Sequence, residues 1–155
     1  MGLFFTGKGD KGSSHIGKKK YPKDSPIVEA LGDLDELNSL LGVVRAHMPK
    51  PRLTGKLENI QENLFIIQAR VAWLMYPKFP SPQMTQDKIE AMEQEINAIE
   101  KKIQPERGFV ISGSDIIASW LDMLRAVSRR VERRVVKLNK TQKLPQEILT
   151  YLNRL

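Results

Sequence analysis

The pattern of apolar and polar positions predicts a long helix near the end of the chain. From Ser114 to Leu138 an apolar residue recurs at helical spacing, so that these residues form one stripe. The stripe consists of Ile117, Trp120, Leu124, Val127, Val131, Val135 and Leu138. Ser114 is a suitable N-cap, and Asp115 suits the first turn, where the helix dipole favours negative charge. We therefore predict a helix over 114–138 with one side in the core.

The same period occurs in earlier segments. Ser25 and Pro26 form a cap followed by proline at the first helical position, which predicts a helix over about 25–47. Further helices are predicted over about 54–75 and 85–102, and a last helical segment over 145–155. The predicted core residues of the first three are Ile27, Leu34, Leu37, Leu41, Val44, Leu57, Ile60, Leu64, Ile67, Val71, Leu74, Ile89, Met92, Ile96 and Ile99. Five helical segments with almost no strand signal predict an all-α, antiparallel five-helix bundle.

The N-terminal stretch is rich in glycine and lysine. Residues 6–14 read TGKGDKGSS, and GKKK at 17–20 continues this basic loop. Glycines let backbone N–H groups approach a ligand closely, and the lysines add positive charge. The spacing differs from that of a Walker A loop. A flexible basic terminus and a phosphate-binding loop are both compatible with these residues.

The long helix also has an arginine-rich side. Arg125, Arg129 and Glu132 lie opposite its apolar stripe. Guanidinium groups at this spacing suit phosphate or carboxylate, because each offers paired donors in one plane. The alternative is an ordinary solvated charged face.

A second unusual surface lies on the first helix, on the side away from its core stripe. Asp35 stands there among the small residues Ser39, Gly42 and Ala46. Small side chains let another backbone approach closely, and Asp35 could then meet an arginine. We interpret this side as a second packing surface, between subunits.

Composition narrows the classes of function. The net charge of +7 favours anionic partners such as nucleotides, nucleic acid or phosphorylated ligands. The absence of cysteine excludes disulfides, cysteine-ligated zinc and thiol catalysis, and fits a reducing compartment. His15 and His47 belong to no metal-ligand pattern, no catalytic triad is recognisable, and no apolar run could span a membrane. We expect a cytoplasmic protein of one domain over 1–155.

Three segments together resemble one family. FTGKGDKGSS at 5–14, EALGDLDELNSLLGVVR at 29–45 and LRAVSRRVERRVV at 124–136 are similar, in order and spacing, to the ATP:cob(I)alamin adenosyltransferases of the PduO type. The resemblance implies a five-helix bundle assembled as a homotrimer, with active sites between subunits. It also implies transfer of the 5′-deoxyadenosyl group of ATP to reduced cobalamin, giving adenosylcobalamin and triphosphate. Residues 1–24 would form the ATP-binding N-terminal loop and residues 25–155 the bundle.

The resemblance also implies roles for individual residues. The N-terminal loop over ATP would contain Thr6, Gly7, Gly9, Asp10 and Gly12, with Lys23 on the phosphates. Arg129, Arg130 and Glu132 would line the nucleotide site, and Asn153 would lie near ATP and its Mg²⁺. Co(I) itself would attack the ribose 5′ carbon, so no protein nucleophile is needed. The protein would position the reactants and neutralise charge.

Three further positions correspond to catalytic features of the family. Asp35 and Arg125 match an acid–arginine pair between neighbouring subunits, and Phe109 matches an aromatic residue that helps displace the lower axial ligand of cobalt. With Arg129 they make the predicted catalytic set. The loop at 109–114 reads FVISGS where the family commonly has FVLPGG, and the sequence ends at Leu155 where the family's last helix continues. We therefore expect a weakly anchored last turn around Asn153.

Alternative functions remain open. A non-catalytic basic bundle could bind nucleic acid through the arginine face, and salt-sensitive binding without ATP preference would indicate it. A relative that binds ATP and cobalamin could deliver or sense cobalamin without efficient turnover. An adenosyltransferase would need a reductase that supplies cob(I)alamin and an adenosylcobalamin-dependent acceptor enzyme, and we expect neither a membrane nor nucleic acid as its partner.

Overall fold

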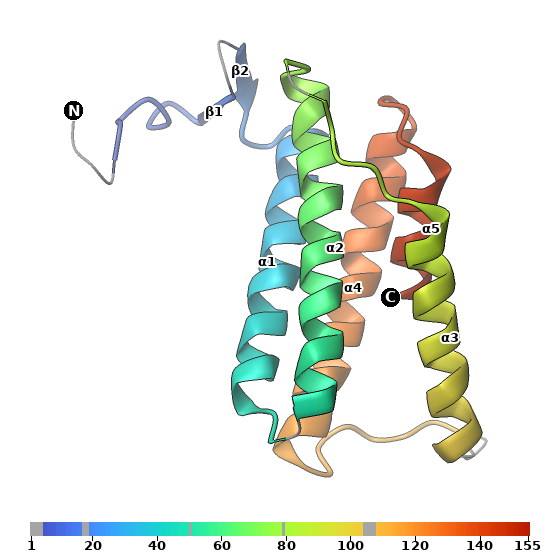
Figure 1. Ribbon diagram of the computed structural model, residues 1–155. Coiled ribbons are helices and arrows are strands. Elements are labelled where there is room, and N and C mark those ends of the chain that lie inside the picture. Colours follow the sequence, from blue (N-terminus) through green and yellow to red (C-terminus); the bar gives the residue numbers. More distant parts are fainter. Residues whose placement is uncertain (1–4, 17–18, 50, 79, 104–107) are drawn as a thin grey trace.

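The computed structural model describes residues 5–16, 19–49, 51–78, 80–103 and 108–155. Within these ranges five helices run alternately down and up (Figure 1): α1 (Pro26–His47), α2 (Pro51–Met75), α3 (Gln86–Ile103), α4 (Ile116–Asn139) and α5 (Gln146–Arg154). The predicted all-α five-helix bundle is confirmed. None of the helices among the described residues is long and apolar enough to cross a membrane.

The helix ends follow local sequence signals, with two corrections. α1 begins at Pro26 as predicted, and α2 begins three residues earlier than predicted, at Pro51. α4 is capped by Asp115 rather than Ser114, because a carboxylate oxygen of Asp115 accepts a hydrogen bond of 2.9 Å from the backbone N–H of Ala118. The helix therefore begins at Ile116.

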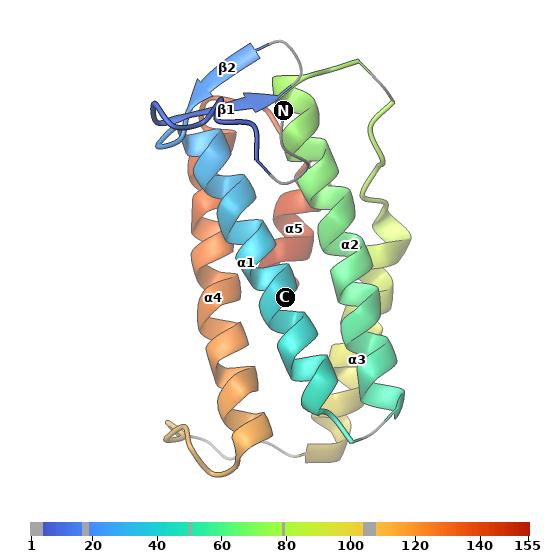
Figure 2. The same ribbon diagram turned by 90° about the vertical axis from the view of Figure 1, so that its left-hand side faces the viewer.

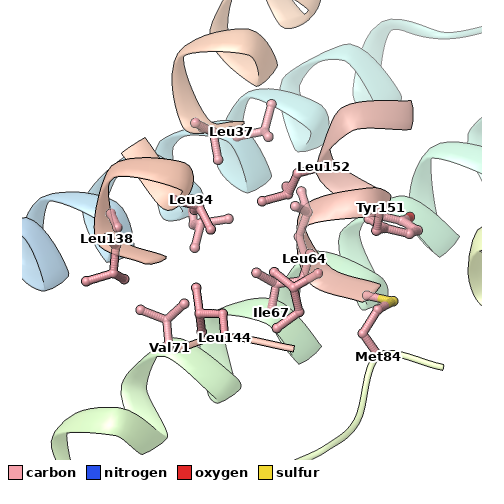
Figure 3. Close-up of a cluster of buried hydrophobic side chains, with 14 of the residues drawn as sticks. Leu34, Leu37, Leu64, Ile67, Val71, Met84, Leu138, Leu144, Tyr151 and Leu152 are labelled. Atoms are coloured by element: carbon pink, nitrogen blue, oxygen red, sulfur yellow. The ribbon is translucent and has the colours of Figure 1, made fainter. Parts of the chain in front are cut away.

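The core lies between α1, α2, α4 and α5 (Figure 3). α1 packs mainly against α4 and α2, and α5 packs against α4. Leu34, Leu64 and Leu138 are fully buried, and Tyr151 of α5 closes the same cluster. All five predicted core residues of α1 are buried, as are five of the seven predicted on α4. The apolar period predicted these buried positions correctly because α1 and α4 each pack against other helices along their length.

The prediction for α3 was partly wrong. Ile89 is buried and Met92 half-buried, but Ile96 and Ile99, predicted as core, are 41% and 44% exposed. The main helix contact of α3 is with α5. The nine residues of α5 extend only about 14 Å, against about 27 Å for α3. The second half of α3 therefore extends beyond the helix that covers its first half.

The N-terminal stretch also differs from the expected continuous loop. Strands β1 (Ser13–Ile16) and β2 (Lys19–Pro22) form an antiparallel hairpin in which Ser14 lies opposite Tyr21. The Tyr21 hydroxyl donates a hydrogen bond of 3.0 Å to the carbonyl of Met75, the last residue of α2. This contact holds the hairpin at the end of the bundle where α1 begins (Figures 1 and 2). The strands escaped prediction because four-residue polar strands carry little periodic signal.

Candidate functional site

The polar side of α4 meets α1 through a row of ion pairs. Arg130 contacts the carboxylate of Glu36, and Arg134 lies 2.9 Å from Glu29 and 3.2 Å from Asp33. The acids on α1 are three or four residues apart, and the two arginines on α4 are four residues apart. Side chains at this spacing share one side of a helix, so each arginine of α4 can reach an acid of the antiparallel α1. These pairs fix the relative height of α1, which carries Asp35, and of α4, which carries four of the predicted site residues.

Arg129 is placed differently from its neighbour Arg130. Its side chain is exposed, and within the described part of the chain it has no ion pair, whereas Arg130 is half-buried and paired with Glu36. One step along a helix rotates a side chain by about 100°, which separates the two guanidinium groups. The prediction that Arg129 faces away from the core is confirmed.

Glu132 and Asn153 lie together, as the predicted nucleotide site requires. The side-chain amide of Asn153 donates a hydrogen bond of 2.8 Å to a carboxylate oxygen of Glu132. The amide oxygen of Asn153 accepts a bond of 2.7 Å from Arg154. The backbone N–H of Leu155 also bonds to the carbonyl of Tyr151. The expectation of a weakly anchored last turn is therefore wrong.

Tyr151 anchors the same helix from its buried side. The side chain is 1% exposed, and its hydroxyl accepts a hydrogen bond of 3.1 Å from the amide of Asn63 on α2. Burial raises the pKa of Tyr151 to about 12, since the phenolate would lose its hydration, while the bond from Asn63 acts in the opposite direction. The phenol is thus neutral and structural, and it fixes α5 two residues before Asn153.

The glycine-rich loop brings Gly9, Gly12 and Lys23 together. Gly12 has φ +72°, in the left-handed region, and its carbonyl accepts a hydrogen bond of 3.0 Å from the N–H of Lys23. A Cβ added to Gly9 would lie 3.2 Å from the carbonyl oxygen of Ser13 and 3.5 Å from Nζ of Lys23. Gly9 therefore makes room for the lysine side chain against the loop, which places a cation beside the loop backbone.

The rest of the predicted loop is open to solvent. Thr6, Gly7 and Asp10 are exposed, and the hydroxyl of Thr6 accepts a long bond of 3.4 Å from the N–H of Lys8. In Figure 1 this segment extends away from the bundle on the α1 side. Within one chain, this segment therefore extends away from α4 and α5, the helices that carry Arg129 and Asn153.

The remaining predicted residues are also on the outside of the chain. Asp35 is exposed, and Arg125 is 67% exposed with a single long contact of 3.8 Å to Asp122. Phe109 is fully exposed in the loop before α4. Ser39 and Ala46 are exposed as expected, but a Cβ on Gly42 would lie 3.6 Å from the amide nitrogen of Gln61, so Gly42 faces α2.

Two of the hollows among the described residues show how open the predicted site is. A pocket of about 150 Å³ beside Arg125 is lined mainly by leucines, among them Leu37 and Leu121. A cleft of about 700 Å³ between α2 and α3 contains Asn63 and Tyr151 but none of the predicted site residues. Ligand pockets usually measure about 300–1,000 Å³. Neither of these two hollows is lined by Arg129 or Glu132, and the Arg129 side chain is exposed to solvent.

Sequence reasoning missed several polar residues beside the site. Glu36, which pairs with Arg130, stands next to the predicted Asp35. Arg154, which contacts Asn153, is in turn bonded to Glu93 of α3. The recurrence of acids on α1 and arginines on α4 could have suggested the first contact. No local sequence pattern could have suggested the contact between Arg154 and Glu93, because these residues lie on separate helices that are distant in sequence.

Comparison with known proteins gives a consistent result. The family model described as cobalamin adenosyltransferase matches residues 4–155. A corrinoid adenosyltransferase of Bacillus subtilis (strain 168) is 34% identical, with 97% of this chain and 79% of the relative covered. The corrinoid adenosyltransferase PduO of Citrobacter freundii is 33% identical over 97% of this chain, which spans about half (46%) of that relative.

A solved structure agrees with these relatives. It is a variant PduO-type ATP:corrinoid adenosyltransferase from Lactobacillus reuteri complexed with cobalamin and ATP. Its TM-score is 0.89 at 28% identity, with 97% of this chain and 83% of that chain covered. The bundle, the matched helices and these relatives agree with the resemblance found in the sequence: the chain belongs to the cobalamin adenosyltransferase family.

Proposed function

We propose that this protein transfers the 5′-deoxyadenosyl group of ATP to the cobalt of cob(I)alamin. The observation that carries the proposal is the joint placement of Arg129, Glu132 and Asn153 on one exposed surface of a family-typical bundle. An exposed guanidinium that has no ion pair with any described residue, beside a carboxylate and an amide, suits a triphosphate with its counter-ion. The related structure that holds cobalamin and ATP supports the same pair of substrates.

The active site in this proposal lies between subunits of a homotrimer. The glycine-rich loop with Lys23 extends away from the bundle, while Arg129 is open to solvent. The loop of one subunit could therefore close over a nucleotide bound to another. Asp35 and Arg125, which do not pair with each other within the chain, would form the contact across that boundary. Phe109 would then face the corrin ring.

The chemistry requires little of the protein beyond positioning and charge. Cob(I)alamin attacks the ribose 5′ carbon, a carbon–cobalt bond forms, and the C5′–O bond breaks. Triphosphate leaves with the bonding electron pair, so negative charge grows on the leaving oxygen. Arg129 would neutralise that charge, Lys23 would hold the phosphates, and Arg130 would contact the phosphates from another side. Glu36 holds Arg130 against α1, so the two arginines present their guanidinium groups in different directions.

The residues present fit a magnesium ion bound mainly by the nucleotide. Among the described residues there is no cluster of three metal-binding side chains. Mg²⁺ in nucleotide sites commonly takes one or two protein oxygens together with phosphates and water. Glu132 and Asn153 would supply these oxygens. Glu132 is the better ligand, because the amide oxygen of Asn153 already accepts a bond from Arg154.

An anaerobic assay with Mg-ATP and chemically reduced cob(I)alamin tests the proposal. Absorbance should show adenosylcobalamin formation that depends on the protein. Arg129→Ala should lower the rate by about 10²-fold or more while the helix stays folded, because its side chain faces solvent. Arg133→Ala is the matched control, since Arg133 is exposed on the same helix and has no proposed role. Equal rates in both variants would contradict the assigned site.

The subunit contact has its own test. Asp35→Asn should weaken the trimer or its cobalamin binding, measured by sedimentation and by cobalamin titration. Asp24→Asn, an exposed acid before α1, should behave as the wild type. A wild-type protein that sediments as a monomer and still turns over at full rate would refute the shared site.

The alternatives predict other outcomes. Tight ATP binding without turnover would indicate a protein that delivers or senses cobalamin. Salt-sensitive binding of DNA or RNA without ATP preference would indicate a nucleic-acid partner instead. In the proposed role the protein works in the cytoplasm, between a reductase that supplies cob(I)alamin and an acceptor enzyme that uses adenosylcobalamin.

A further inference from the structure

A chain of charged and polar side chains connects α3 to the candidate nucleotide site. Nε of Arg154 donates a hydrogen bond of 2.7 Å to Oε1 of Glu93, and its Nη1 donates one of 2.7 Å to Oδ1 of Asn153. Nδ2 of Asn153 then donates one of 2.8 Å to Oε1 of Glu132. The four residues come from α3, α5 and α4, so the connection depends on the packing of three helices.

The two ends of the Asn153 amide therefore face opposite charges. Its oxygen faces the guanidinium of Arg154, and its nitrogen faces the carboxylate of Glu132. A rotation of 180° about the last side-chain bond would place NH₂ against the cation and the oxygen against the anion. An asparagine amide has almost the same shape in both orientations, so hydrogen-bond partners decide between them. Arg154 selects one orientation only as long as its guanidinium stays in place.

Glu93 holds that guanidinium. Both side chains of the Glu93–Arg154 pair are 40% exposed, so water and salt weaken their attraction. The Arg154 side chain has many rotamers, and a carboxylate on Nε restricts them while Nη1 remains directed at Asn153. The role of Glu93 is thus to order a neighbour rather than to supply much stability.

We propose that Glu93 and Arg154 are positioning residues that fix the amide of Asn153 and, through it, the carboxylate of Glu132 for nucleotide binding. The inference rests on the proposed function, because it takes Asn153 and Glu132 to contact the bound ATP or its counter-ion. It assigns to α3 a part in nucleotide affinity, although α3 carries none of the residues that the family resemblance implies.

The test compares Glu93→Gln with Glu95→Gln in the full-length chain. Glu95 lies on the same helix and also pairs across to another helix, but its partner is Lys56 of α2. Each substitution removes one charge from α3 and one partly exposed ion pair, so both should change the melting temperature by a similar small amount. Mg-ATP affinity is measured by titration calorimetry. Glu93→Gln should weaken it by about two- to tenfold, the usual effect of one hydrogen-bonding contact, and Glu95→Gln should leave it unchanged.

A double-mutant cycle separates positioning from general structure. If Glu93 acts through Asn153, then Glu93→Gln should have no further effect on ATP affinity in an Asn153→Ala background. An equal loss in both backgrounds would overturn the proposal, and so would equal affinities for Glu93→Gln and Glu95→Gln.

Failure of the proposed function would look different. In that case the wild-type protein itself would either not bind Mg-ATP or bind it without converting cob(I)alamin to adenosylcobalamin. Tight binding by the wild type, a loss with Asn153→Ala and no loss with Glu93→Gln would overturn only the positioning roles. Tight binding that Asn153→Ala leaves unchanged would overturn them as well, because Asn153 is the residue through which they act.

Discussion

The buried Tyr151 predicts a stability difference that changes sign with pH. The perturbation is Tyr151→Phe, which removes one hydroxyl and leaves the ring in the core. At pH 8 the variant should be less stable by about 1 kcal/mol, the cost of a lost buried hydrogen bond. The cost stays small because the amide of Asn63 keeps its other bond, of 2.9 Å, to Asn59.

Alkaline pH reverses this difference. The pKa of Tyr151 is about 12 in the folded protein and 10.0 for an ordinary tyrosine. Below about pH 9 both states keep the phenol proton. Between pH 10 and 12 the unfolded chain loses it first, so ionisation favours unfolding of the wild type but not of the variant. The wild type loses about 1.4 kcal/mol relative to the variant by pH 11 and about 2.3 kcal/mol by pH 12. The two stabilities should therefore cross near pH 11.

The measurement is guanidinium unfolding followed by circular dichroism at a series of pH values. Both proteins are compared at one concentration, because subunit association would add to the apparent stability. Ile148→Val is the control, since it costs about 1 kcal/mol at a fully buried position of the same helix without changing a titratable group. Its difference from the wild type should not depend on pH. A Tyr151→Phe difference that stays constant up to pH 11.5 would refute the conclusion that the phenol is shielded from water.

Three further predictions concern the core, a helix cap and the loop. Leu34→Ala in the fully buried core of α1 should lower the free energy of unfolding by about 2–5 kcal/mol in denaturant titrations. Asp115→Ala should cost about 0.5–2 kcal/mol by the loss of the cap on Ala118, whereas Ser114→Ala should be nearly neutral; the reverse order would restore Ser114 as the cap. Gly12→Ala should strain the loop by about 1 kcal/mol at its positive φ, so that Mg-ATP titrations show weaker binding while the bundle melts as before.

Part of the site could be predicted from the sequence, because the direction in which a side chain points follows from the apolar period of its own helix. The period of apolar residues placed the core side of α4, and with it the outward direction of Arg129. The same reasoning placed Asp35 on the exposed side of α1. A pattern read along α4 alone could not distinguish the environments of Arg129 and Arg130, because the difference arises from Glu36 on the facing helix α1.

The sequence by itself determined the five helices, most of their bounds and the core side of α1 and α4, since these follow from propensity, capping and a period of 3.6 residues. The tertiary structure decided which charges meet: Arg134 with Glu29, Asn153 with Glu132, and Arg154 with Glu93. It also decided that Ile96 and Ile99 stay exposed, because α5 is too short to cover them. The physical reason is that each such contact depends on the height and rotation of two helices packed side by side, and no local pattern contains that information.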